Sequence, residues 1–433
     1  MNAFPGEWMI ERLKDVASIN AASLPANTDM DYEFDYLEIS NVDYYGIVDP
    51  LAIERLRYED APSRARRRLC DGCTAISSVR PNLQAVAFID NAPGNLVCST
   101  GFNVVQPVAH KLSPKFTYYS LVAEGARQYF EATAKGVGYP AVDDKDFQSF
   151  SVALPPVSEQ QRIAAYLDSS CVAIDAAVAA KRGQLETLDA VRESIIERAV
   201  TRGLDAPETL RSIEQDWIGS LPEHWTATRI KQVIARMDYG ISVSSEQEGR
   251  FPVLKMGNIQ AGEIVFAKIE FVDEVSDELL LRTNDLLYNR TNSPDQVGKA
   301  ALFRGTKDDA VTFASYLVRL RPNHRIIPEF LNYTVNCGGF LAFARRLAVP
   351  SVQQSNLNST RYGRMLVPLP PVREQHMICE YLAAKVGNLK SVVATIQSQI
   401  TTLTAYRKSL IHECVTGQRR ITDVDLNRIQ AHG

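Results

Sequence analysis

The sequence predicts an α+β protein in which two globular blocks of mixed helix and strand alternate with two long helices. The prediction rests first on a motif that occurs twice. Leu-Pro-Pro-Val-Ser-Glu-Gln at Leu154–Gln160 returns 215 residues later as Leu-Pro-Pro-Val-Arg-Glu-Gln at Leu369–Gln375. Behind each copy the sequences align without a gap as far as Val200-Thr201 and Val415-Thr416. Repetition on this scale indicates that one structural unit is built twice.

Each copy of the motif leads into a segment with the pattern of one long helix. Its prolines end the preceding strand because proline cannot donate to a sheet ladder, and Ser158 and Glu159 suit a helix N-terminus. Apolar residues then follow at alternating steps of four and three, from Leu167 to Ala199 and again from Leu382 to Cys414. This spacing is typical of a coiled-coil seam, and its length favours a helix pair over one amphipathic helix on a globular core.

Arg192 and Arg407 interrupt the two seams at matched positions. A polar residue in a seam can fix the register and orientation of a helix pair. Alternatively, each arginine buries its apolar stem and extends its guanidinium to solvent. The sequence leaves both interpretations open.

A second repeated piece marks the start of each block: Pro5-Gly6-Glu7-Trp8 resembles Pro222-Glu223-His224-Trp225. The distance from each tryptophan to the following Leu-Pro-Pro is nearly the same, whereas the intervening sequences diverge. We therefore predict six segments in the chain: a first globular block 1–153, a helical region 154–202, a linker 203–220, a second block 221–368, a second helical region 369–416 and a tail 417–433.

The net charge of −4 is unevenly distributed. The first block carries a net charge of −6 and the second +3, and local charge matters more than the total for phosphate binding. Seven scattered cysteines indicate free thiols in a reducing compartment. No stretch of about 18 uncharged apolar residues occurs, and the N-terminus lacks a signal-peptide pattern. We expect a cytoplasmic protein.

Both blocks contain strand-like segments, including Tyr36–Val42, Val253–Ile259, Asp285–Arg290 and Val311–Leu320. Late in each block a short helix, 118–134 or 328–347, precedes a loop, 135–140 or 350–358. Asparagine and glutamine can read adenine edges and arginine can read guanine, although such polar runs are also common in ordinary solvated loops. The candidate nucleic-acid contacts are Arg64, Arg66, Arg67, Arg68, Arg80, Lys135, Tyr139, Asn289, Arg290, Asn292, Arg345, Arg346, Gln353, Gln354 and Asn356.

The sequence lacks the common catalytic motifs. It has no phosphate-binding P-loop, no dinucleotide fingerprint, no nucleophile elbow and no His-Glu-x-x-His. It also has no Asn/Asp-Pro-Pro-Tyr/Phe, the pattern expected of an adenine methyltransferase. Cys70 and Cys73 have no second ligand pair at zinc-type spacing, so buried thiols are a better interpretation than a metal site. We expect a non-catalytic chain that binds no metal or cofactor.

The order of these features resembles the specificity subunit of type I restriction-modification systems. A Pro-x-x-Trp segment, a variable block, Leu-Pro-Pro-x-x-Glu-Gln and a long helix follow one another twice, over about residues 5–418. The connecting segment Asp216–Trp225 is a particularly close match. The first block departs from the pattern, because it carries Gly138-Tyr-Pro-Ala in place of the polar Gln353-Gln-Ser-Asn run.

This resemblance implies two pseudo-symmetric target recognition domains separated by an antiparallel helix pair. Each domain would read one half of a bipartite, asymmetric site on double-stranded DNA. Two methyltransferase subunits would dock on the helices, a restriction and translocase subunit could join them, and S-adenosylmethionine, ATP and Mg would belong to these partners. Two alternatives stay open: the specificity portion of another methyltransferase-nuclease system, and a coiled-coil scaffold that has lost DNA binding.

Overall fold

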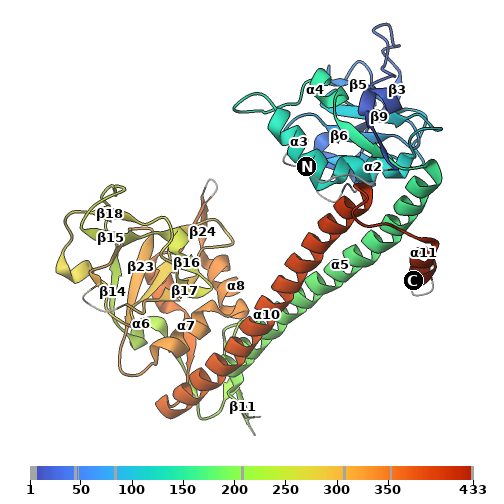
Figure 1. Ribbon diagram of the computed structural model, residues 1–433. Helices are drawn as coiled ribbons and strands as arrows, with labels where there is room; N and C mark the ends of the chain where they lie inside the picture. Colours follow the sequence, from blue (N-terminus) through green and yellow to red (C-terminus); the bar gives the residue numbers. More distant parts are fainter. Residues whose placement is uncertain are drawn as a thin grey trace. The chain divides into compact units, whose positions relative to one another are not determined.

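A computed structural model shows the chain folded into two compact units (Figure 1). Unit 1 comprises residues 1–182 and 397–433, and unit 2 comprises residues 183–396. The helices α5 (Val157–Arg202) and α10 (Val372–Val415) each contribute residues to both units. The structure describes residues 7–42, 46, 48–81, 85–205, 209–305, 309–351 and 354–430.

Both long helices begin directly after a Leu-Pro-Pro segment, as the sequence predicts. They contain 46 and 44 residues, so the repeat preserves their length closely. The carbonyl of Pro156 accepts from the amide of Gln160 at 3.0 Å, and Pro371 accepts in the same way from Gln375 at 3.1 Å. Glu159 and Glu374 lie in the first turns, where a carboxylate complements the positive end of the helix dipole.

The two helices run antiparallel within each unit. In unit 1, Lys181 Nζ donates to Gln399 Oε1 at 2.6 Å, and Asp175 pairs with Arg407 further along. Residue numbers thus fall along α5 as they rise along α10. In unit 2, the end of α5 and the start of α10 share one hydrophobic core. The predicted seam is buried in unit 1 at Leu167, Cys171, Ile174 and Val178.

By length and composition, α5 contains one stretch that could cross a membrane. The same helix carries two carboxylates with partners inside unit 1. Tyr119 donates to Asp168 at 2.7 Å, and Arg407 pairs with Asp175 at 2.9 Å. Since ionised side chains are costly within lipid, we interpret α5 as a helix that packs against its own protein.

The globular part of unit 1 is built on two four-stranded sheets and one short strand pair. The pair joins β1 (Met9–Arg12) to β10 (Ser151–Leu154), so the two ends of the block meet. One sheet has the order β2 (Ala17–Ile19), β9 (Phe102–Pro107), β6 (Thr74–Ser77), β7 (Val86–Phe88), and the other β4 (Glu54–Arg57), β3 (Glu33–Leu37), β8 (Leu96–Ser99), β5 (Ala65–Arg68). The shorter helices of this unit are α1 (Leu13–Val16), α2 (Pro114–Val122), α3 (Glu124–Thr133), α4 (Asp144–Gln148) and α11 (Asp423–Gln430).

Unit 2 repeats this plan, with β13 (Thr226–Arg229) paired to β26 (Leu366–Leu369). Its largest sheet has the order β14 (Ile234–Tyr239), β23 (Leu317–Pro322), β19 (Leu286–Asn289), β21 (Ala300–Leu302), β17 (Gly262–Ile264), β16 (Ile259–Gln260). Smaller sheets join β18 (Glu270–Val272), β15 (Phe251–Leu254), β22 (Thr312–Phe313); β20 (Thr291–Asn292), β25 (Gln354–Asn356), β24 (Val349–Ser351); and β11 (Leu210–Ser212), β12 (Ser220–Pro222). Its shorter helices are α6 (Ile230–Val233), α7 (Pro328–Asn336), α8 (Gly338–Leu347) and α9 (Ser359–Arg364).

The α+β fold class is confirmed, but several local predictions differ from the structure. Each late helix is two helices, because the backbone leaves the helical conformation at Ala123 and at Cys337. The predicted strand 311–320 is divided between β22 and β23. The segment 203–220 is not a free linker, since Trp217 and Ile218 are buried in the core of unit 2.

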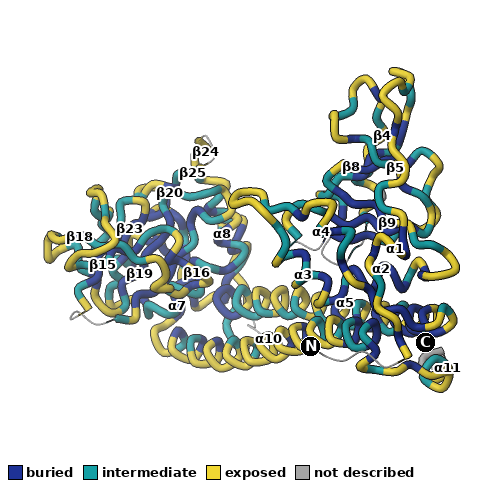
Figure 2. Tube along the Cα trace, turned by 45° about the horizontal axis from the view of Figure 1, so that its top comes forward, coloured by how far each residue is buried: buried dark blue, intermediate teal, exposed yellow. Residues whose placement is uncertain are grey.

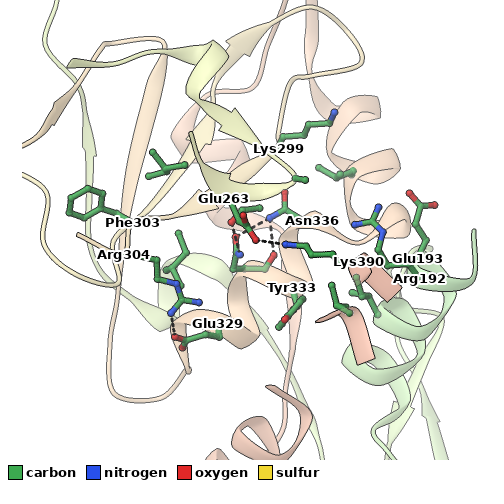
Figure 3. A pocket seen from close by; sticks show the side chains of 18 of the residues that line it. Arg192, Glu193, Glu263, Lys299, Phe303, Arg304, Glu329, Tyr333, Asn336 and Lys390 are labelled. Carbon is green, nitrogen blue, oxygen red and sulfur yellow. Dashed lines mark hydrogen bonds and ion pairs between the residues drawn. The ribbon is translucent and has the colours of Figure 1, made fainter. Parts of the chain in front are cut away.

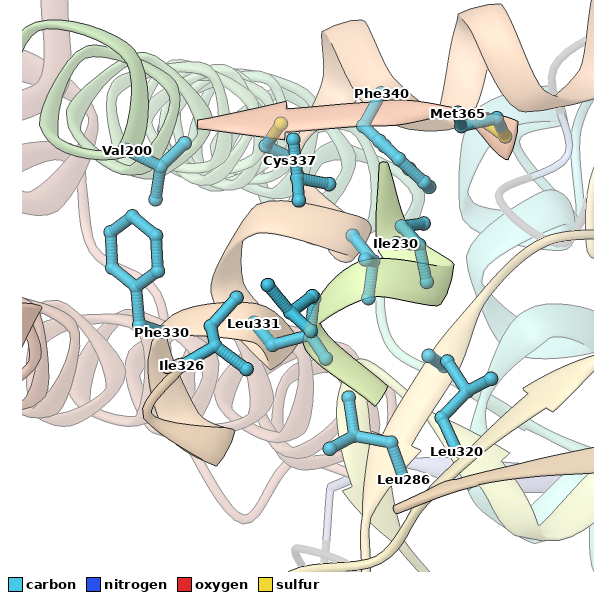
Figure 4. Packing of buried hydrophobic residues seen from close by; sticks show 14 of the residues in the cluster. Val200, Ile230, Leu286, Leu320, Ile326, Phe330, Leu331, Cys337, Phe340 and Met365 are labelled. Carbon is cyan, nitrogen blue, oxygen red and sulfur yellow. The ribbon is translucent and has the colours of Figure 1, made fainter. Parts of the chain in front are cut away.

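The core of unit 2 joins the globular block to the long helices (Figure 4). Val200 of α5 lies in the same cluster as Phe330 and Leu331 of α7 and Phe340 of α8, and all four are fully buried. Strands β19 and β23 contribute Leu286 and Leu320 from the sheet side. Block and helices therefore share one core and fold as one body in this unit.

A buried glutamine fastens each block to the first turn of its long helix. Gln160 Oε1 accepts from the amide of Ser113 at 2.8 Å, and its Nε2 donates to the carbonyls of Lys111 and Pro155, both at 2.9 Å. Ser113 is the residue before α2. Gln160 is completely buried, so these three bonds replace three of the four that its amide can make with water.

Gln375 repeats this arrangement in unit 2. Its Oε1 accepts from Ile327, the residue before α7, at 2.7 Å, and its Nε2 donates to Arg325 and Pro370 at 3.0 and 2.9 Å. Gln160 and Gln375, here called the glutamine clamp, explain why the motif ends in Gln. An amide both accepts and donates, whereas a carboxylate would only accept.

We expect Gln375→Ala to lower the free energy of unfolding of unit 2 by about 1–3 kcal/mol, because a buried amide and two carbonyls lose their partner. Chemical denaturation followed by circular dichroism would measure the change. Gln397→Ala, at an exposed position of α10, is the control and should leave stability nearly unchanged. Equal effects of the two substitutions would contradict the role of the clamp.

Candidate nucleic-acid interface

In unit 2, the predicted polar loop 350–358 is largely a β-hairpin anchored on the end of a central strand. Strands β24 and β25 pair antiparallel, and β25 also pairs with β20, which directly follows β19. Asn356 Nδ2 donates to Thr291 Oγ1 at 2.8 Å. Gln354 is exposed on the hairpin, whereas Gln353 lies outside the described residues. The hairpin therefore brings β25 beside β20, with Asn356 opposite Thr291 and Ser355 opposite Asn292, although the two strands are about sixty residues apart in sequence.

Unit 1 places its shorter loop at the corresponding position. Lys135 and Ala141 bridge each other, and Ala141 also bridges Val79, just after β6. The amide of Arg80 donates to Pro140 at 2.7 Å. The Arg80 guanidinium lies 4.5 Å from the centre of the Tyr139 ring, and Tyr139 is 74% exposed. The predicted residues Arg80, Lys135 and Tyr139 are thus brought together.

The charge of Lys135 in this loop is balanced by two carboxylates. Its Nζ lies 2.6 Å from Asp143 and 3.1 Å from Asp146. Hydrogen bonding to Asp143 and Asp146 raises the pKa of Lys135, so the lysine stays protonated. The positive charge exposed at this position of unit 1 is therefore mainly that of Arg80.

The four predicted arginines 64 and 66–68 lie on or beside β5 and do not form one basic patch. Arg64 pairs with Glu38 at 2.6 Å. Arg67 is half-buried and donates to Asn103 at 3.1 Å, and burial lowers the pKa of its guanidinium. Alternate residues of a strand face opposite sides, so the four cannot act on one ligand together. The remaining two make local contacts: Arg66 with the Tyr58 ring and Arg68 with the Gly94 carbonyl.

Two exposed tyrosines lie beside the unit 2 hairpin and were missed by sequence reasoning. The Arg290 guanidinium is 5.0 Å from the centre of the Tyr239 ring, and the amide of Arg290 donates to the carbonyl of Tyr316 at 3.0 Å. Tyr239 and Tyr316 are each nearly half exposed. Their signal in the sequence is weak: Tyr239 precedes Gly240, where a β-carbon would collide with the Phe313 carbonyl.

The other candidates of unit 2 do not belong to this surface. Asn289 is 1% exposed, because the last residue of β19 points into the protein, so it is withdrawn as a contact. Arg345 donates to the carbonyl of Asp295. Arg346 pairs at 3.2 Å with Asp216, on the turn between β11 and β12. The remaining candidates of unit 2 are Arg290, which lies over the Tyr239 ring, and three residues of the β20–β25 pair, with Asn292 on one face of the pair and Gln354 and Asn356 on the other.

Comparison with known proteins supports a specific family. Residues 5–181 match the sequence model of the type I restriction modification DNA specificity domain. The chain is 25% identical to the putative type I restriction enzyme MjaX specificity subunit of Methanocaldococcus jannaschii, over 46% of this chain and about half (47%) of that subunit. It is 23% identical to the MjaVIII specificity subunit of the same organism, over 72% of this chain and 71% of that subunit.

Solved structures show the same fold. A chain from work on complex assembly and conformational transition of the type I R-M system aligns with a TM-score of 0.78, covering 96% of this chain and 99% of that one at 19% identity. The HsdS subunit from Thermoanaerobacter tengcongensis aligns with a TM-score of 0.53, over 96% and 98% of the two chains at 20% identity. The chain is therefore similar in sequence to type I restriction enzyme specificity subunits and shares their fold.

The two matched seam arginines of this chain differ in their partners. Arg407 pairs at 2.9 Å with Asp175 on the other long helix, and its side chain is only 12% exposed. Arg192 instead donates to Asp189, one turn earlier on its own helix, and is 32% exposed. Arg407 thus fits a residue that fixes helix register, whereas Arg192 fits the solvent-reaching alternative.

A cavity of about 670 Å³ lies in unit 2 of the subunit, between its sheet, α7 and the long helices (Figure 3). Its charged lining is compensated: Lys390 pairs with Glu263 at 2.6 Å, and Arg304 pairs with Glu329 at 2.5 Å. This balance does not suit a polyanion. Among the described residues, no cluster of three or more His, Cys, Asp or Glu side chains could hold a metal.

Replacing the matched arginines by methionine keeps their apolar stems and removes their charge. We expect Arg407→Met to destabilise unit 1 by about 1–3 kcal/mol, because it leaves Asp175 partly buried without its ion pair. Arg192→Met should change unit 2 by no more than about 0.5 kcal/mol, as is usual for an exposed pair. Denaturant unfolding of the two variants provides the test, and a larger loss for Arg192→Met would refute the assignment.

Proposed function

We propose that this specificity subunit reads a bipartite, asymmetric sequence on double-stranded DNA, one half with each unit. One observation carries the proposal. Both units present a hairpin or loop at the same position of their repeated fold, next to the residues that follow a central strand, β19 in unit 2 and β6 in unit 1. The framework is the repeated part, and the hairpin is where the two sequences diverge. Such a division suits a scaffold that holds two different reading surfaces.

In unit 2, the proposed base contacts are Asn292, Gln354 and Asn356, whose amides can bind adenine edges in the major groove. Arg290 would bind guanine or phosphate, and its stacking on Tyr239 orients the guanidinium. Unit 1 offers Arg80 and Tyr139 instead. The two surfaces differ chemically, which is what reading an asymmetric site requires.

We propose that the long helices dock two methyltransferase subunits and that a restriction and translocase subunit can join them. Val191 and Tyr406 occupy equivalent repeat positions on α5 and α10, and both are exposed. Figure 2 shows that α10 has many exposed residues along its length. Exposed apolar side chains at matched positions suit two copies of one partner. S-adenosylmethionine, ATP and Mg would be bound by those partners in the cytoplasm, and this chain would have no catalytic role.

Exchanging one block should change one half of the target only. We expect a chain in which residues 221–368 come from another family member to methylate sites with the original first half and a new second half. Methylome sequencing of the host, compared with a host that lacks the gene, would show this. Loss of both halves, with methylation otherwise intact, would contradict the assignment of one half-site to each unit.

Replacing Gln354 and Asn356 together by alanine should relax the second half-site at one or two positions. Each lost bidentate contact costs about 1–3 kcal/mol of discrimination. Arg290→Ala should weaken binding more generally if the guanidinium contacts phosphate, and it should then lower the salt dependence. Gln247→Ala, at an exposed position of the same unit, is the control. Binding of DNA by the reconstituted methyltransferase complex would be measured, and unchanged specificity in the double variant would exclude the hairpin as a reading element.

A further inference from the structure

Helix α3 of unit 1 and helix α8 of unit 2 each begin against a long helix. The long-helix side chains at this contact are basic or neutral in unit 1 and acidic in unit 2. We infer that these charges match each globular block to its own stretch of the helix pair, so that the two blocks of the repeat are not interchangeable. The inference concerns assembly within the chain. It does not depend on DNA reading.

In unit 2, α8 directs its N-terminus at two carboxylates of α5. A β-carbon built at Gly339 would lie 3.0 Å from Glu197 Oε1, and one built at Gly338 would lie 3.8 Å from both Glu193 and Glu197 oxygens. The start of α8, Cys337-Gly338-Gly339, has no charge of its own, since burial raises the pKa of Cys337 to about 12. Glu193 and Glu197 therefore supply the negative charge that a helix N-terminus favours.

In unit 1, α3 carries its own negative charge at the equivalent place and faces basic side chains. Helix α3 begins at Glu124. The pKa of the Glu124 carboxyl falls to about 2, mainly because Arg127 hydrogen-bonds the carboxylate, and Gln128 and Lys408 lower it further. The ring of His412 is also close: its Cε1 would lie 3.6 Å from a β-carbon at Gly125.

The repeat makes these contacts directly comparable. With the 215-residue offset of the two helices, Lys408 corresponds to Glu193 and His412 to Glu197. The starts of α3 and α8 correspond as helix starts, at an offset of 214 residues, so Glu124 occupies the place of Gly338. In unit 1, two basic or neutral side chains face the acidic start of α3. In unit 2, two acidic side chains at the equivalent positions face the uncharged start of α8.

A second pair of positions shows the same inversion. Asp175 of α5 corresponds to Lys390 of α10. Asp175 pairs with Arg407 in unit 1, whereas Lys390 pairs at 2.6 Å with Glu263 of β17 in unit 2. If the second block lay on the helix stretch of unit 1, Glu263 would meet the carboxylate of Asp175 in place of an ammonium group.

Transposing the blocks would therefore create like-charge contacts. Glu124 would meet Glu193 and Glu197, and the positive end of α8 would meet Lys408. Each contact turns from attractive to repulsive, although the shared clamp and strand pairs would still allow docking. The helix pair thus favours one order of blocks over the other.

The test compares two transposed chains in which residues 9–153 and 226–368 exchange places. One keeps the natural helices; the other also carries Glu193→Lys, Glu197→His, Lys408→Glu and His412→Glu. We expect the charge-exchanged chain to have a melting temperature about 2–4 °C above that of the transposed chain with natural helices. We also expect it to yield more soluble protein. An equal or lower melting temperature would overturn the inference.

Point variants of the natural chain keep the inference testable if neither transposed chain folds. Hydrogen–deuterium exchange of α8 amides should become about tenfold faster in the double variant Glu193→Lys, Glu197→Lys. Glu186→Lys, at an exposed position of the same helix, should not affect α8. Faster exchange of α3 in Lys408→Glu should be reversed by adding Glu124→Gln. Unchanged α8 exchange, or no reversal at α3, would overturn the inference.

Discussion

The structure depends on a buried amide that joins the first turn of each long helix to the start of a helix in the globular block. Gln160 and Gln375 satisfy one amide and two carbonyls each, with distances that agree within about 0.1 Å between the units. Both glutamines are buried, and among side chains of similar size only an amide both accepts and donates in this way. The strand pairs β1–β10 and β13–β26 complete the junction.

One framework holds two chemically different surfaces. Unit 2 presents the amides of its hairpin and Arg290 stacked on Tyr239, whereas the loop of unit 1 presents Arg80 stacked on Tyr139. Both are held by backbone hydrogen bonds to the residues after a central strand, β19 or β6. Backbone bonds do not depend on side-chain identity, so the tips can change while their position is kept.

The helix pair is less symmetric than its sequence repeat. Arg407 crosses to Asp175, but the repeat partner of Asp175 is Lys390, which would repel Arg192. Arg192 accordingly pairs within its own helix, and Lys390 pairs with the block. Equivalent positions of the two long helices therefore have different partners, depending on which globular block packs against them. The same asymmetry appears where α3 and α8 meet the helices, with Lys408 in one unit and Glu193 in the other.

The sequence by itself determined the repeat, the two helices, their starts after Leu-Pro-Pro, and the family, because these depend on local spacing and on motifs. It did not determine which polar residues face solvent. Asn289 and Arg290 are neighbours, yet only Arg290 reaches the surface. Arg64, just before β5, pairs with Glu38, whereas Arg67 on β5 donates to Asn103. The segment 203–220 joins the core of unit 2 through Trp217. Tertiary structure decided these points, since burial and pairing depend on segments distant in sequence, whereas helix periodicity is written within a few turns.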